Sequence, residues 1–243
     1  MQIKQELEAY SKTNIYDFDN SIILNDYPNR VIEKLKSEGK DLLNLSLLEL
    51  GLGHGYSTNV LKKHFRKYTV LEGDSRIIEI YKTQYSNTCV DIIHTCFEEF
   101  DTDKKYDVII MGFILEHVDN PVEIIKKYKN MLNANGRIFI TVPNAQALNR
   151  RIGKEIGMLK DLKQLSQNDI MLGHKRYYDV VTLKDDILKS ESIVKSIEGI
   201  YLKPFTTAQL MSLDLSPEIY KALCTIGREY PELCLGLLAE VGK

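Results

Sequence analysis

The chain has little net charge, no long basic run and no long hydrophobic run. Its 243 residues include 32 basic and 34 acidic side chains, which gives a net charge of −2. A general nucleic-acid-binding protein needs a basic surface to neutralise phosphates, so this balance argues against nucleic acid as a partner. No window approaches about 20 apolar residues, so we expect no membrane-spanning segment.

The cysteines are few and widely spaced. They are Cys89, Cys96, Cys224 and Cys234. None forms a CxxC pair, and no histidine tract adjoins them. This pattern argues against structural zinc and a disulfide framework, and it is typical of reduced thiols. The N-terminal sequence MQIKQELEAY is charged and lacks the apolar stretch of a signal peptide. We therefore expect a cytoplasmic protein.

Short apolar runs alternate with helical patterns along the chain, which predicts βαβ units around a parallel sheet. The predicted strands cover residues 46–51, 68–73, 88–94, 106–112, 136–142, 192–202 and 233–241. Apolar side chains at helical spacing predict helices at 27–38, 56–66, around 77–81, from 121 to 132, and at 182–190.

The strongest functional signal is a glycine-rich loop between the first strand and the helix after it. Gly51, Gly53 and Gly55 let the backbone turn sharply and approach a ligand closely. Their GxGxG spacing differs from the GxGxxG fingerprint of dinucleotide-binding proteins, because Tyr56 stands where the third glycine is needed. Glu49, just before the loop, would repel a pyrophosphate but suits a ligand that carries an ammonium or sulfonium cation.

A second acid follows at the end of the next predicted strand. Glu72 lies 21 residues after Gly51, and an acid at this place can accept both ribose hydroxyls of a nucleoside. The sequence LEGDS offers Asp74 as the alternative. The loop and these acids together predict a site for a nucleoside that carries a cationic group.

The segment from Glu49 to Gly55 resembles motif I of class I S-adenosylmethionine-dependent methyltransferases, and the order of elements from about 40 to 142 is similar to that family throughout. The resemblance implies that the three glycines cradle the methionine part of the cofactor, with Glu49 nearby, and that Glu72 binds the ribose. The family often has an acid near the adenine amino group, and this sequence departs from that pattern. The further cofactor-binding residues we expect are Cys96, Phe97, Glu98, Met111 and Gly112.

The resemblance also implies an α/β fold: a doubly wound, Rossmann-like sheet of seven mostly parallel strands with an antiparallel last strand. A chain of this length can form one domain. We divide residues 1–243 into four parts. They are an N-terminal helical cap (1–40), a cofactor-binding core (41–142), a lid or substrate insertion (143–180) and the C-terminal part of the sheet (181–243). The third part is polar and interrupted by glycines, which favours a lid or substrate wall, otherwise a mobile loop.

Methyl transfer from a sulfonium is an in-line displacement, so the protein must chiefly align the reactants, and a base helps when the acceptor is a hydroxyl. His117 lies in an LEHV string similar to a hallmark of many small-molecule methyltransferases, and His174 closes the inserted segment. Either histidine is a candidate base, with His174 preferred by a small margin. In ubiquinone-type O-methyltransferases, a Glu three residues before the Glu-His pair helps bind a divalent metal. Phe113 stands in that place here, so we predict no metal site.

The sequences VPNAQALNRR and GHKRYYD resemble methyltransferases of bacterial capsule and O-antigen clusters. The resemblance implies a small acceptor that bears a sugar or phosphate, such as a nucleotide-linked sugar, methylated on oxygen. Methylation of an amino sugar on nitrogen, or of a phosphoryl or phosphoramidate capsule substituent, are alternatives. For the second sequence, a solvated basic loop is an equally weighted interpretation. The candidate acceptor-binding residues are Tyr27, Arg30, Asn144, Arg176 and Tyr177, and the first two can instead reach the methionine carboxylate.

Three rival functions stay open at this point. A nicotinamide-dependent sugar oxidoreductase or epimerase is disfavoured by the glycine spacing and by the absence of a Tyr-x-x-x-Lys pair after the fourth strand. A cofactor-binding partner subunit without turnover would keep the same glycine loop. Methylation of a protein side chain would require an open, shallow site. The oligomeric state is also left open.

Overall fold

The computed structural model describes residues 14–85 and 90–243, with side chains from residue 18 onward. The first part of the predicted cap, the start of the predicted strand at 88–94 and Cys89 lie outside the described residues. In the described part, no helix is long and apolar enough to cross a membrane.

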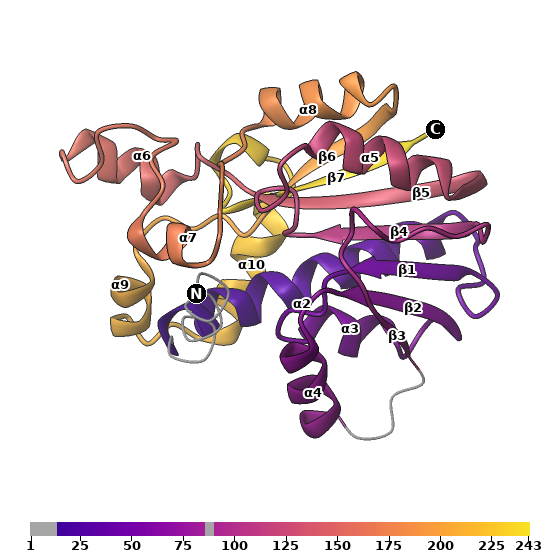
Figure 1. Cartoon of the computed structure of the whole chain (residues 1–243). Coiled ribbons are helices and arrows are strands. Elements are labelled where there is room, and N and C mark those ends of the chain that lie inside the picture. Colours follow the sequence, from indigo (N-terminus) through magenta and orange to yellow (C-terminus); the bar gives the residue numbers. More distant parts are fainter. Residues whose placement is uncertain (1–13, 86–89) are drawn as a thin grey trace.

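A sheet of seven strands forms the centre of the molecule (Figure 1). The strands are β1 (Ser46–Leu50), β2 (Lys67–Glu72), β3 (Asp91–His94), β4 (Tyr106–Gly112), β5 (Leu132–Pro143), β6 (Ile193–Ile200) and β7 (Gly236–Gly242). Their order in the sheet is β3-β2-β1-β4-β5-β7-β6. β1 to β5 pair in parallel, whereas β7 is antiparallel to both β5 and β6. The predicted α/β fold with a reversed last strand is therefore confirmed.

Helices cover both faces of the sheet and extend beyond its carboxyl edge (Figure 1). They are α2 (Asn14–Ser37), α3 (Tyr56–Leu61), α4 (Ser75–Gln84), α5 (Pro121–Asn130), α6 (Leu148–Glu155), α7 (Gln167–Met171), α8 (Val180–Lys189), α9 (Thr207–Ser212) and α10 (Pro217–Gly227), with a short 3₁₀ turn, η1 (Pro231–Leu233). The sheet thus has the doubly wound arrangement in which ligands bind at the carboxyl ends of the strands.

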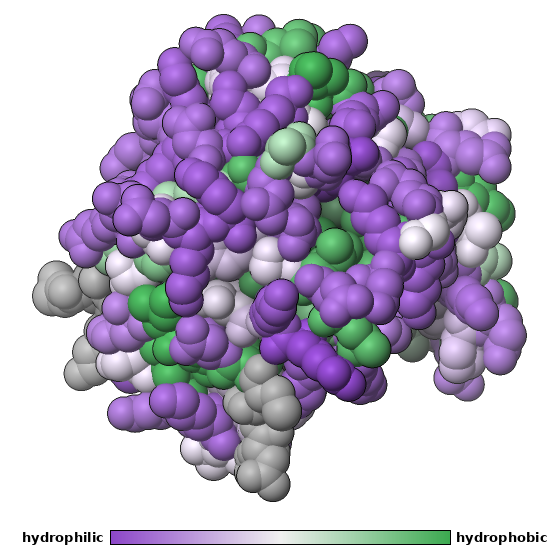
Figure 2. Space-filling model, turned by 90° about the vertical axis from the view of Figure 1, so that its right-hand side faces the viewer, coloured by the Kyte–Doolittle hydropathy of each residue, from purple (hydrophilic) through white to green (hydrophobic). Residues whose placement is uncertain are grey.

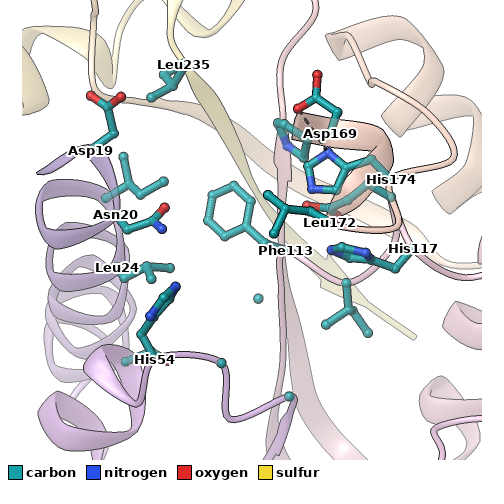
Figure 3. A pocket seen from close by; sticks show the side chains of 18 of the residues that line it. Asp19, Asn20, Leu24, His54, Phe113, His117, Asp169, Leu172, His174 and Leu235 are labelled. Atoms are coloured by element: carbon teal, nitrogen blue, oxygen red, sulfur yellow. Dashed lines mark ion pairs between the residues drawn. The ribbon is translucent and has the colours of Figure 1, made fainter. Parts of the chain in front are cut away.

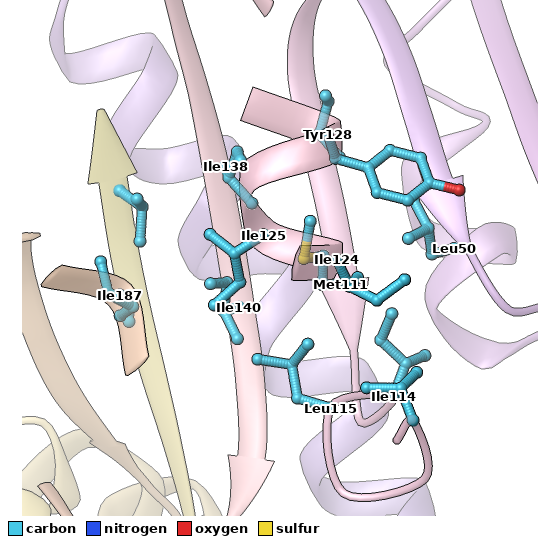
Figure 4. Packing of buried hydrophobic residues seen from close by; sticks show 14 of the residues in the cluster. Leu50, Met111, Ile114, Leu115, Ile124, Ile125, Tyr128, Ile138, Ile140 and Ile187 are labelled. Atoms are coloured by element: carbon cyan, nitrogen blue, oxygen red, sulfur yellow. The ribbon is translucent and has the colours of Figure 1, made fainter. Parts of the chain in front are cut away.

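Alternate residues of the central strands belong to two separate hydrophobic clusters, because successive side chains of a strand point to opposite faces. Leu48 and Ile109 pack with α5 and α8, as the close-up in Figure 4 shows for part of this cluster. Leu47 and Val108 pack on the other face with α2, α3, α4, α9 and α10. Burial on both faces explains why these strands read as continuous apolar runs.

The end of the molecule opposite the carboxyl edge shows no broad apolar area among the described residues. Figure 2 shows the end of the molecule opposite α6 and α7, where most residues are hydrophilic and the hydrophobic ones form small, separate patches. Scattered hydrophobic residues of this kind are normal on a protein surface.

Several element boundaries differ from those predicted. α2 begins at Asn14, well before the predicted start at residue 27, and runs through Pro28 without ending. α3 ends at Leu61, before the predicted end of the helix at 66. No sequence pattern predicted α9 and α10, which fill the stretch between the predicted strands at 192–202 and 233–241. Their apolar patterns extend over only a few residues. Their burial depends on tertiary contacts, of α9 with α2 and of α10 with β6.

Arg30 has a different place from the one predicted for it. Its side chain is 1% exposed, and its guanidinium donates to the carbonyl oxygens of Gly199 at 2.6 Å and Cys224 at 2.7 Å. An ion pair of 2.5 Å joins it to Asp26, one turn earlier in α2. Arg30 therefore holds α2 against β6 and α10, which is a correction to its assignment as a ligand-binding residue.

This arrangement predicts that Arg30→Ala lowers the free energy of unfolding by about 3 kcal/mol, because the change leaves buried polar partners without a donor. Denaturant unfolding followed by circular dichroism measures this loss. Lys126→Ala removes an exposed pair with Glu191 and serves as the control, with no resolvable change. Equal stability of the Arg30→Ala variant and the wild type would contradict the structural role of Arg30.

Candidate functional site

A pocket of about 890 Å³ lies at the carboxyl edge of the sheet. Its floor is formed by the loops after β1, β2 and β4, and its walls come from α2, α7 and the segment before α9. β1 and β4 are neighbours in the sheet, and the chain turns to opposite sides from them. Open α/β sheets bind their ligands at such a switch point.

The glycine loop forms one part of the floor and has a backbone that only glycine adopts easily. Gly51, Gly53 and Gly55 have φ angles of +84°, +48° and +73°, and all three line the pocket. A Cβ atom on Gly55 would lie 2.6 Å from a ring carbon of Tyr81. The loop therefore needs glycine for both its turn and its packing.

Glu49 is buried beneath this loop and does not line the pocket. Its carboxylate accepts hydrogen bonds of 2.6 Å from the hydroxyls of Ser57 and Thr58 and another from the hydroxyl of Tyr68. Burial raises the pKa of Glu49, and the hydrogen bonds oppose that rise. Glu49 thus joins β1 to the first turn of α3 and to β2, whereas the sequence placed it near the methionine part of the cofactor.

Glu72 lies at the end of β2 and lines the pocket. Its carboxylate accepts backbone hydrogen bonds from Leu52 at 2.9 Å and from Asp74 at 3.0 Å. Asp74 also lines the pocket, but it caps α4 and binds the guanidinium of Arg76, whose hydrogen bond lowers the pKa of Asp74. Glu72 is fixed by backbone donors alone, so its remaining lone pairs can face a ligand.

The loops after β3 and β4 complete this side of the pocket. Cys96, Phe97, Glu98 and Gly112, which the sequence analysis assigned to the cofactor, line it. Their backbone is anchored, since Tyr128 donates to the carbonyl of Phe97 at 2.9 Å and Lys127 donates to that of Glu98 at 2.6 Å. Met111 does not line the pocket, because its side chain packs in the core beneath β4. This is a correction to its predicted place.

Tyr27 lines the pocket from α2, as its predicted role requires. A Cβ atom on Gly112 would lie 2.6 Å from the Tyr27 hydroxyl, so the tyrosine packs directly on this glycine. Its side chain is 1% exposed. Tyr27 therefore shapes the junction between the cap and the loop after β4.

Two histidines and a glutamate meet on the opposite wall. The rings of His117 and His174 lie edge to face, with centroids 4.7 Å apart, and Glu116 adjoins them (Figure 3). Asp169 of α7 lies 3.6 Å from Nδ1 of His174. The structure thus brings both predicted candidate bases to one place, together with two acids that the sequence analysis did not assign.

Burial controls the charges of this cluster. It raises the pKa of Glu116 to about 8 and lowers the pKa of His117 to about 4, with His174 adding to the second shift. The pKa of His174 is also lowered by burial, and the charge of Asp169 opposes that shift. Both imidazoles are therefore neutral at pH 7, and each can offer a ring nitrogen as a lone-pair donor.

The inserted segment contributes to the pocket through only some of its predicted residues. Tyr177 lines the pocket, and its hydroxyl donates to Asp169. Asn144 also lines it. Its side-chain amide donates to backbone carbonyls of the turn before β7, and the shortest of these hydrogen bonds, 2.8 Å, is to the carbonyl of Cys234. Arg176 does not line the pocket, which is a correction. Its guanidinium donates instead to the carbonyl oxygens of Leu115, Val118 and Asp119.

Across the pocket from the histidines lies a buried ion pair that the sequence analysis missed. Lys203 pairs with Asp19 of α2 at 2.5 Å, and the hydroxyl of Thr207 donates to the same carboxylate oxygen. All three residues line the pocket, and Figure 3 shows Asp19 facing the wall that carries His174. The pair joins positions 184 residues apart, so no local pattern could have shown it.

Comparison with known proteins identifies relatives of this chain. A family model described as a methyltransferase domain matches residues 23–188. The ubiquinone biosynthesis O-methyltransferase of Rickettsia bellii is 30% identical over 119 residues, which are 48% of this chain and 49% of that protein. The malonyl-[acyl-carrier protein] O-methyltransferase of Priestia megaterium is 32% identical over 103 residues, which are 41% of this chain and 38% of that protein. The chain thus spans about half the length, or less, of these curated relatives.

Solved structures share the fold over nearly the whole chain. The N-methyltransferase NodS from Bradyrhizobium japonicum, in complex with S-adenosylhomocysteine, has a TM-score of 0.62 at 13% identity and covers 99% of this chain and 97% of its own. Magnesium protoporphyrin IX methyltransferase from Synechocystis, also with S-adenosylhomocysteine, has a TM-score of 0.60 at 11% identity and covers 98% and 93%.

The geometry of the loop predicts a difference between two glycine substitutions. Gly53→Ala costs about 1 kcal/mol of stability, because alanine must adopt a positive φ with open space around its Cβ. Gly55→Ala adds a clash with Tyr81 and costs about 2–4 kcal/mol. Denaturant unfolding of the two variants measures both values, and equal losses would show that the packing of Gly55 is not as described.

Proposed function

Because the chain belongs to the methyltransferase-domain family, we propose that it transfers the methyl group of S-adenosylmethionine to an oxygen atom of a small polar acceptor. The family match confirms the class predicted from the glycine loop. The product from the donor is S-adenosylhomocysteine, which two of the structural neighbours described above carry.

The proposal rests on one observation: two walls of different chemistry lie across one pocket from each other. The wall from the glycine loop to Glu98 has the features expected for the cofactor, and the wall from Glu116 to His174 has buried nitrogen and oxygen donors. A pocket of about 890 Å³ lies at the upper end of the range for ligand sites, so it has room for a cofactor and an acceptor together.

The cofactor is proposed to lie along the carboxyl ends of β1 and β2. The backbone of Gly51 to Gly55 would hold the methionine part, and the carboxylate of Glu72 would accept the ribose hydroxyls. Cys96, Phe97 and Glu98 would enclose the adenine. The sulfonium methyl then points toward the acceptor side, where alignment of the reactants supplies most of the rate acceleration.

Oxygen is the favoured acceptor atom for two reasons. The curated relatives named above are both O-methyltransferases. A hydroxyl must lose its proton as it attacks, and the neutral imidazoles of His117 and His174 lie where an acceptor would sit. Both histidines are therefore proposed to take part in activating the acceptor hydroxyl.

The charges that line the pocket favour a hydroxyl-rich acceptor without phosphate. Recognition of phosphate uses cations with free hydrogen-bond donors. In the described part of the chain, the lysines and arginine that line the pocket are already engaged: Lys203 with Asp19, Lys175 with Asp119, and Arg150 with the carbonyl of Leu162. A free sugar or a comparable polyol thus fits better than a nucleotide-linked sugar, and a role in capsule or envelope glycan synthesis stays a prediction.

Calorimetric titration of the purified protein tests the cofactor part. S-adenosylmethionine and S-adenosylhomocysteine are expected to bind, NAD is not, and Glu72→Gln is expected to weaken both by at least about tenfold, or about 1.4 kcal/mol. Glu79→Gln makes the same change on an exposed residue of α4 and should leave the affinity unchanged. Binding of NAD alone would contradict the proposal.

A turnover assay tests the acceptor wall. Formation of S-adenosylhomocysteine is followed with neutral sugars, nucleotide sugars and phenols as acceptors. With an accepted substrate, His174→Ala and His117→Ala should each lower kcat by about 100-fold or more, while the affinity for S-adenosylhomocysteine changes less than about twofold. Wild-type turnover in both variants would leave positioning as the only catalytic device and refute the role of the histidines.

A further inference from the structure

The cluster of Glu116, His117 and His174 has the geometry of a three-ligand metal site. One ligand atom from each residue lies within 4.8 Å of the other two. The first two residues come from the turn after β4, and the third comes from the end of the inserted segment, 57 residues further along the chain. All three line the pocket, and Figure 3 shows both histidines on the same wall.

Both histidines lie beside groups that can orient their rings. The ring of His117 contacts the backbone of Leu172 and Gly173, and Nδ1 of His174 lies 3.6 Å from the carboxylate of Asp169. Nδ1 of His174 is buried and has no hydrogen-bond partner in the described part of the chain. Histidines that bind metals are usually oriented by a nearby carbonyl or carboxylate, and either ring nitrogen of a neutral imidazole can bind a metal ion.

Glu116 supplies an oxygen whose burial is otherwise unexplained. Its side chain is 1% exposed, and its Oε2 atom has no hydrogen-bond partner among the residues that the structure describes. In the same part of the chain, the guanidinium of Arg176 donates to backbone carbonyls and forms no ion pair with Glu116. A buried carboxyl oxygen without a partner is costly, and a divalent cation between Glu116 and the two imidazoles would supply that partner.

We propose that Glu116, His117 and His174 bind a divalent metal ion of the zinc type, with an open coordination position that faces the pocket. Two imidazole nitrogens and one carboxylate oxygen are the ligand set of many catalytic zinc sites, which keep one position for water or substrate. The sequence predicted no metal site because Phe113 interrupts the local motif. The fold supplies a third ligand from a distant segment instead.

This inference rests on the proposed function and specifies how the acceptor is activated. An acceptor hydroxyl that takes the open position becomes more acidic on the metal. Its O–H bond breaks, the proton passes to solvent water, and the oxygen attacks the methyl carbon of S-adenosylmethionine. The new O–CH₃ bond forms as the CH₃–S⁺ bond breaks, which leaves S-adenosylhomocysteine and no net redox change.

The test is calorimetric titration of the chelator-treated full-length chain with ZnCl₂, together with absorption spectroscopy after titration with CoCl₂. We expect one equivalent of Zn²⁺ to bind with micromolar or tighter affinity and Co²⁺ to give the visible bands of a four- or five-coordinate site. Glu116→Gln and His174→Ala should each weaken Zn²⁺ binding at least about 100-fold. His64→Ala, which alters a histidine outside the pocket, should bind as the wild type does.

Circular dichroism establishes that each variant is folded before titration, and the Co²⁺ spectrum of the wild type tests the site without any substitution. Absence of stoichiometric Zn²⁺ binding by the wild type would overturn the proposal, and so would unchanged binding in both ligand variants. The cofactor titration distinguishes failure of the metal site from failure of the proposed function. Binding of S-adenosylhomocysteine without Zn²⁺ binding refutes only the metal site, whereas Zn²⁺ binding without cofactor binding refutes the proposed function.

Discussion

The buried carboxyl group of Glu49 holds together the elements that form the glycine-loop side of the pocket. Hydroxyls of Ser57, Thr58 and Tyr68 converge on it from α3 and β2, so one carboxyl group ties together three elements that meet at the carboxyl edge of the sheet. A buried carboxyl group is tolerated only when its hydrogen-bonding capacity is filled, which makes this arrangement specific. The glycine loop that follows Glu49 joins two of these elements, and its glycines adopt the positive φ angles of that turn.

The second wall depends on the docking of the inserted segment against the turn after β4. The backbone N–H of Lys175 donates to the carbonyl of Glu116 at 2.8 Å, and Arg176 donates to three further carbonyls of the same turn. These bonds hold His174 beside His117. The two histidines of the pocket therefore come from two segments that a backbone contact aligns, and the same contact brings the three proposed metal ligands together.

The sheet could be predicted because its strands are buried on both faces and so appear as apolar runs. The glycine loop could be predicted because its function depends on local backbone conformation. Arg30 and Arg176 were misplaced because a cation in a sequence looks the same whether it binds a ligand or a carbonyl oxygen of a distant strand. The pair of Asp19 and Lys203 and the approach of His174 to Glu116 depend on tertiary contacts that no spacing encodes.

We propose that one pocket holds S-adenosylmethionine on the β1–β2 side and the acceptor beside the histidines. A crystal structure of the protein with S-adenosylhomocysteine would test this arrangement most directly. We expect ribose hydroxyls within hydrogen-bond distance of Glu72, the methionine part along Gly51 to Gly55, and the sulfur atom directed toward His117 and His174. A cofactor bound with its ribose away from Glu72, or outside this pocket, would refute the proposed arrangement.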